Sequence, residues 1–98
     1  MKIYIFRVSK YWQWCNGGLV AKAENWKDLE DVVKLYAHGK SIEEKYECNY
    51  TLKKEEPILT ANSNGSFEDK DGLWILVESY ELEGEQKKGV VLCEYNEG

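Results

Sequence analysis

A single stretch of this chain, residues 25–39, repeats its apolar residues with the period of an α-helix. The apolar stripe contains Trp26, Leu29, Val32, Val33, Tyr36 and Ala37. Asn25 is placed to cap the start of this helix, with Asp28 three residues on, and Gly39 is placed to end it. Because the other ordered segments read as strands, the sequence predicts a sheet covered by this one helix.

Two strands are predicted before the helix. Lys2–Val8 carries apolar residues on both faces, which is typical of a central strand covered on both sides. Leu19–Ala23 is the expected return strand. Asn16-Gly17 is a strong two-residue turn signal that would pair Trp14 with Leu19 in one long hairpin. In the alternative, the first strand ends near Val8 and residues 9–18 form a loop. We favour a bent hairpin, because a regular strand reaching that turn would be unusually long.

Further strands are predicted after the helix. Residues 46–53 alternate strictly and read as a half-buried strand, and Ile58–Thr60 fits a short edge strand beyond Pro57. Leu73–Leu82 is a long strand, with Gly89–Tyr95 as its partner across a polar loop. The sequence therefore predicts a single α+β domain over residues 1–98. Its sheet of four to five mainly antiparallel strands follows the order β-β-α-β-(β)-β-β.

Charge is distributed unevenly along the 98 residues, whose formal net charge is −5. Residues 1–67 hold ten basic and nine acidic side chains, whereas residues 68–98 hold three basic and nine acidic ones. A nucleic-acid binder normally carries a basic excess that neutralises phosphates. No apolar run is long enough to span a bilayer, and the N-terminus lacks the pattern of a secretory signal. We therefore expect a cytoplasmic protein that binds neither nucleic acid nor membrane directly.

The residues that usually carry catalysis are sparse. His38 is the only histidine, and the sequence places no nucleophile beside it. Cys15, Cys48 and Cys93 are widely spaced and form no CxxC pair, so neither a zinc site nor a disulfide framework is expected. No phosphate-binding loop occurs. We predict a protein that is not an enzyme and needs no cofactor or metal, with a small enzyme using Cys15 or His38 as the alternative.

One candidate binding surface is the aromatic and basic N-terminal hairpin. Its residues are Arg7, Lys10, Tyr11, Trp12, Trp14 and Lys22. Aromatic rings beside cations stack bases and hold phosphates, and the same residue types also dominate protein interfaces. The hairpin is therefore a candidate site for a protein partner, or for a nucleotide or other small molecule. Alternatively, the tryptophans at i and i+2 share one sheet face and belong to the core.

A second candidate surface is the acidic last third of the chain. Its carboxylates are Glu68, Asp69, Asp71, Glu78, Glu81, Glu83, Glu85 and Glu94. Such side chains, gathered on one face, would complement a positively charged surface on another protein.

In these respects the chain resembles the small acidic inhibitors made by phages, the anti-CRISPR proteins among them. The resemblance is one of kind: a small acidic domain without catalytic motifs, and no family motif is shared. It implies a non-enzymatic protein that occupies a partner's nucleic-acid-binding or interaction surface, in the host cytoplasm if it is phage-encoded. The sheet edges expected at Ile58–Thr60 and Gly89–Tyr95 would also allow two copies to pair as a homodimer.

Overall fold

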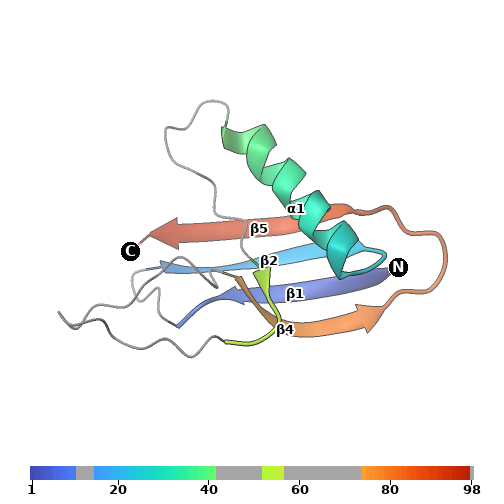
Figure 1. Cartoon of the computed structure of the whole chain (residues 1–98), viewed down its shortest axis with the longest axis horizontal. Helices are drawn as coiled ribbons and strands as arrows, with labels where there is room; N and C mark the ends of the chain where they lie inside the picture. Colours follow the sequence, from blue (N-terminus) through green and yellow to red (C-terminus); the bar gives the residue numbers. More distant parts are fainter. Residues whose placement is uncertain (11–14, 42–51, 57–73, 98) are drawn as a thin grey trace.

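The fold is α+β, with one helix packed on a five-stranded sheet (Figure 1). This is a computed structural model that describes residues 1–10, 15–41, 52–56 and 74–97. The elements are β1 (Lys2–Val8), β2 (Cys15–Ala23), α1 (Trp26–Ser41), β3 (Leu52–Lys53), β4 (Trp74–Glu81) and β5 (Gly89–Glu97). The α+β prediction, with one helix and a mainly antiparallel sheet, is confirmed.

The sheet has the strand order β3-β4-β1-β2-β5, so β1 lies at its centre as the sequence predicts. β1 pairs antiparallel with β2 on one side and with β4 on the other. β5 pairs antiparallel with β2 and forms one edge. The short strand β3 lies parallel to β4 and is the one parallel neighbour among the described strands. Most of the 46–53 strand and all of the 58–60 strand predicted from the sequence lie outside the described residues.

Helix α1 begins as the sequence predicts. The Asn25 side-chain oxygen accepts a hydrogen bond from the Asp28 backbone N–H at 2.9 Å, and the Asp28 carboxylate accepts one from the Glu24 N–H at 3.0 Å. The predicted end was wrong: the helix continues through Gly39 to Ser41. Glycine lowers helix propensity by only about 1 kcal/mol, which is too little to stop a packed helix by itself.

The core lies between α1 and one face of the sheet. β1 contributes Tyr4, Phe6 and Val8, because alternate residues of a strand share a face. From β2, Ala21 and Ala23 are fully buried, and α1 contacts this strand and β5. The Trp26 ring meets Tyr4 edge-on, with ring centroids 6.2 Å apart, and meets Phe6 at 5.9 Å.

The hairpin register predicted from Asn16-Gly17 was wrong. β1 ends at Val8, and Phe6 pairs with Leu19 while Arg7 pairs with Gly18. Asn16 and Gly17 lie inside β2, where they pair with the backbone of β5. Gly17 has φ 142°, a conformation that glycine adopts easily, so this residue serves an extended strand and not a turn. The pairing with β5, which joins eight residues of β2 to that strand, outweighs the local turn preference.

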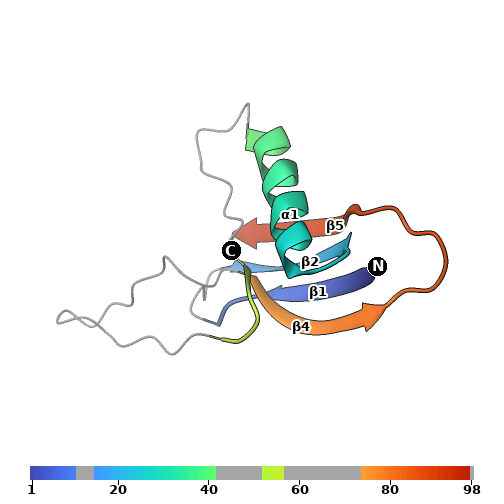
Figure 2. The same cartoon turned by 45° about the vertical axis from the view of Figure 1, so that its right-hand side comes forward.

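The predicted pairing of the last two strands was also wrong. β4 and β5 do not touch, because β1 and β2 lie between them (Figure 2). Three strand spacings separate them, about 14 Å. The connection of seven residues, Leu82 to Lys88, can reach about 24 Å when extended, which is ample for this crossing. A short polar connection therefore joins the two strands that flank the central hairpin.

Candidate functional site: the open face of the sheet

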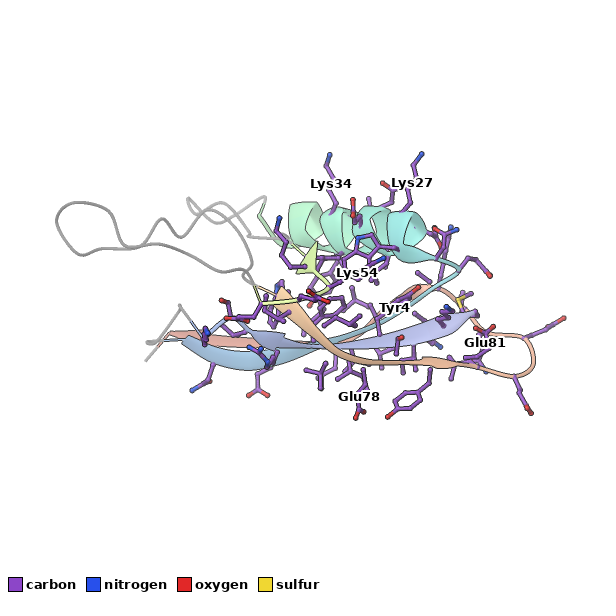
Figure 3. The ribbon with its side chains drawn as sticks, turned by 60° about the horizontal axis from the view of Figure 1, so that its bottom comes forward. Tyr4, Lys27, Lys34, Lys54, Glu78 and Glu81 are labelled. Carbon is purple, nitrogen blue, oxygen red and sulfur yellow. The ribbon has the colours of Figure 1, made fainter. Side chains whose placement is uncertain are left out.

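The second face of the sheet carries no described element, whereas α1 covers the first. Figure 3 shows Tyr4 between the sheet and the helix, and Glu78 projecting from the opposite side. On β1, Ile3 and Ile5 belong to this second face, since they alternate with the buried Tyr4 and Phe6. Both are half-buried, although the sequence predicted a strand covered on both sides.

Two β-bulges lie in one row across the sheet. Ile5 and Val20 are paired at its centre. The register of β4 shifts between Ile5 and Phe6, and that of β5 shifts between Val20 and Ala21. A bulge adds one residue to a strand and turns its side chain. Here each bulge adds a valine to the same face: Val77 is 51% exposed and Val91 is 56% exposed.

These bulges complete an apolar surface that we call the open face. Its exposed and half-buried apolar members are Ile3, Ile5, Val20, Val77, Tyr80, Val91 and Leu92, whereas Ile75, which pairs with Arg7 on the same face, is buried. Tyr80 and Leu92 are 52% and 57% exposed. Four strands about 4.8 Å apart and five residues in length span roughly 300 Å² in projection, an area that also holds the charged residues of the face. The largest apolar patch on a typical monomer is about 300–600 Å² and is often functional.

Three rows of residues run across the open face, as the strand pairings show. The first row contains Tyr80, Ile3 and Lys22. The middle row contains Glu78, Ile5, Val20 and Leu92, with the two bulges directly beside it. The third row contains Ile75, Arg7, Gly18 and Glu94, and Ile75 is only 2% exposed, so the β4 end of this row is covered. Lys22 therefore lies at one end of the face and Glu94 at the other.

The charged side chains of the open face have both signs. Lys22 is half-buried, and Arg7, Glu78 and Glu94 are exposed. The Tyr80 hydroxyl donates a hydrogen bond to the Glu78 carboxylate. This bond, with a smaller contribution from burial, raises the pKa of Tyr80 above its usual value. The face therefore has an apolar middle with ionic groups placed around it.

Glu56 holds the end of β1 in place. Its Oε1 atom accepts hydrogen bonds from the Ser9 hydroxyl and the Lys10 N–H, both at 2.8 Å. Its Oε2 atom lies 3.1 Å from Arg7 Nη2 and accepts no well-aligned hydrogen bond, so the ion pair compensates that atom. Arg7 also donates to the Val8 carbonyl. The carboxylate thus ties residues 52–56 to the edge of the open face.

The acidic residues predicted as one surface lie in several places. Glu78 and Glu94 lie on the open face, on strands about 14 Å apart. Glu81 lies beside the Met1 amino group, 3.2 Å from it. Glu83 and Glu85 are exposed in the β4–β5 connection. Glu68, Asp69 and Asp71 lie outside the described residues.

The predicted hairpin residues are separated in a similar way. Arg7 and Lys22 lie in the two outer rows of the open face, and Arg7 is engaged by Glu56. Lys10 is exposed just beyond β1. Tyr11, Trp12 and Trp14 lie outside the described residues, as do the side chains of Cys15 and His38. Whether the hairpin aromatics bind a ligand stays a prediction.

The apolar members of the open face were missed in the sequence. The runs Trp74–Val77 and Val90–Cys93 show no clean alternation, because each contains a bulge. They therefore resemble buried segments. One signal was available in the number of elements. A single helix can cover only one face of a five-stranded sheet, so apolar residues on the other face must meet something else.

Comparison with protein-family models, with curated proteins and with solved structures found no match to this chain. Within the described ranges, no helix has the length and apolar character that crossing a membrane requires. Among those same residues, no three histidine, cysteine or acidic side chains gather as a metal-binding group.

Proposed function

We propose that this chain is a non-enzymatic protein-binding domain and that its open face is the binding surface. The observation that carries this proposal is the row of two matched bulges, which places Val77, Val91 and Leu92 more than half exposed on one face. Exposed valine and leucine gain free energy when a partner covers them, roughly 25 cal/mol for each Å² of apolar surface. A face that served only the fold would gain more from polar residues here.

The surroundings of the ionisable groups support binding over catalysis. General acid–base chemistry needs a carboxylate in an apolar pocket that shifts its pKa. Glu78 and Glu94 are instead exposed beside the apolar residues. Groups in this setting orient and select partners by charge, and they contribute more to specificity than to affinity.

The resemblance to phage inhibitors gives the proposal its most specific form. In that form, the domain occupies the basic surface of a host protein that handles nucleic acid. Glu78 and Glu94 at the sides of the open face, with Glu83 and Glu85 in the connection, would face the partner's lysines and arginines. High salt would then weaken binding, because it screens such pairs.

A pair of leucine variants tests the proposal. Leu92→Lys places a charge on the open face, whereas Leu35→Lys makes the same change on α1, where Leu35 is 76% exposed. The tagged parent chain is used to isolate a protein partner from its source cells, and the partner's affinity for each purified variant is then measured. We expect Leu92→Lys to abolish binding and Leu35→Lys to preserve it. Equal binding of both variants would overturn the proposal.

A further inference from the structure

We propose that the outer edge of β4 accepts an extended, basic segment of another protein, which pairs with it as an added strand. The proposal rests on the chain being a protein-binding domain, and it names the kind of segment that the domain binds. β4 is the outermost long strand of the sheet, and β3 pairs only with Trp74 and Ile75 at its start (Figures 1 and 2). The rest of this edge is the site of the added strand.

The direction of the β4 backbone groups follows from one hydrogen bond. The Leu82 N–H donates to the Met1 carbonyl at 2.8 Å, so these two opposite residues form a hydrogen-bonded pair. In an antiparallel ladder such pairs alternate with pairs that exchange no hydrogen bonds. The register between β1 and the end of β4 is regular, so Glu81 and Ser79 belong to pairs of the second kind. Their N–H and C=O groups therefore point away from β1, towards the outer edge.

No described element pairs with these backbone groups. After β3 the chain leaves the edge: the Lys54 ammonium lies over the Trp26 ring, 5.2 Å from its centroid, and Glu56 bonds to Ser9 beside β1. Outward backbone groups at a sheet edge are a template for an extended segment. Residues 77–81 are all exposed, and α1 packs over β2 and β5. An added strand therefore meets no obstacle among the described residues.

The charge of this part of the chain selects a basic segment. Residues 74–86 contain no lysine, arginine or histidine, and their acidic side chains are Glu78, Glu81, Glu83 and Glu85. Glu81 lies 3.2 Å from the Met1 amino group, which partly balances it, whereas Glu78 accepts its hydrogen bond from the uncharged Tyr80 hydroxyl. Opposite charges on neighbouring strands attract each other. A lysine or arginine of the added strand would therefore lie favourably beside Glu78.

A second copy of this chain is a poor occupant of the same edge. Pairing two copies of β4 would set two acidic strands side by side, with no basic residue on either, and like charges on neighbouring strands repel. The bulge at Val77 also restricts the regular edge to the end of β4, which protects it from a long identical strand. A short segment that pairs only with Ser79 and Glu81 avoids the bulge.

The test is amide hydrogen exchange of the isotopically labelled chain, followed by NMR. In the free chain the Ser79 and Glu81 amides should exchange fast, whereas the Tyr80 amide, which bonds to β1, should exchange slowly. The probe is a capped synthetic peptide in which lysine alternates with valine. At about ten times its Kd, this peptide should slow exchange of the Ser79 and Glu81 amides about tenfold.

Two matched controls test the role of charge. The same peptide with glutamate in place of lysine should bind about tenfold more weakly or not at all. Glu78→Gln keeps an acceptor for the Tyr80 hydroxyl and should weaken binding of the lysine peptide about threefold. Glu30→Gln makes the same charge change at an exposed position of α1 and should leave the affinity unchanged.

Slow exchange of the Ser79 and Glu81 amides in the free, dilute chain would overturn the proposal, because the edge would then be covered within the chain. Protection that rises with the concentration of the chain alone would overturn it in favour of a second copy, and equal binding of the two peptides would overturn the basic segment. If the lysine peptide protects neither amide while Leu92→Lys still abolishes binding of an isolated partner, the proposed function stands without the added strand. If neither effect appears, both fail.

Discussion

Three leucines provide a graded test of which face belongs to the core. Leu29 on α1 is fully buried, Leu92 on β5 is 57% exposed and Leu35 on α1 is 76% exposed. Each is changed to alanine, so the chemical change is the same. The free energy of unfolding should fall by different amounts, because the three side chains lose different amounts of buried surface.

The magnitudes follow from burial. Leucine to alanine removes three carbon groups, worth about 2.4 kcal/mol when fully buried at about 0.8 kcal/mol each. A little under half of Leu92 is hidden, which gives about 1 kcal/mol, and Leu35 gives about 0.5 kcal/mol. Leu29→Ala also leaves a cavity, so about 3–5 kcal/mol is expected there.

The assay is urea unfolding followed by tryptophan fluorescence and circular dichroism. It is run at low protein concentration, so that self-association contributes little to the measured stability. A loss at Leu92 as large as that at Leu29 would refute the reasoning, because it would mean that the open face is covered within a single chain. A loss at Leu35 larger than that at Leu92 would refute the ordering by exposure.

Two further predictions concern single contacts. Glu56→Gln should lower the free energy of unfolding by up to about 1 kcal/mol, since it removes only the partly exposed ion pair with Arg7. Glu56→Ala also removes the bonds from Ser9 and Lys10 and should cost about 2–3 kcal/mol, measured by urea unfolding; equal losses in the two variants would contradict this. The Glu24 N–H and then Lys88 lower the pKa of Asp28, so Asp28 stabilises the fold above its unfolded pKa of about 3.9. That stability is lost as pH falls through the lower folded pKa. The melting temperature should therefore fall less between neutral and acidic pH in Asp28→Asn than in the parent. An equal fall in both proteins would contradict this prediction.

Local signals in the sequence predicted the elements that depend on local contacts. The Asn25 cap and the apolar stripe of α1 require only residues within a few turns, and they define the helix start correctly. The period of two in β1 likewise identifies its buried side. The cap, the helical stripe and the strand period depend on residues that are close together in the sequence, so they can be recognised without knowing the fold.

Contacts between distant segments could not be predicted in this way. Asn16-Gly17 has a strong turn preference, yet its conformation is decided by pairing with β5, some eighty residues along the chain. The placement of β1 and β2 between β4 and β5 also depends on which strands complete the core under α1. Partly buried Leu76 of β4 and Cys93 of β5 pack against that core from opposite sides.

The candidate site was hidden from the sequence for a related reason. A bulge shifts the alternation by one residue, so the inward and outward residues of β4 and β5 cannot be assigned from a period of two. Val77 and Val91 appear as members of buried runs until the register of each strand is known.

The most direct test of the account is methyl NMR of the isotopically labelled chain, titrated with the protein partner isolated from its source cells. If the open face is the binding surface, the methyl signals of Ile3, Val20 and Leu92 shift when the partner is added, whereas those of Leu29 and Leu35 stay fixed. Shifts confined to the α1 side, or no shifts when the partner is bound, would contradict the account.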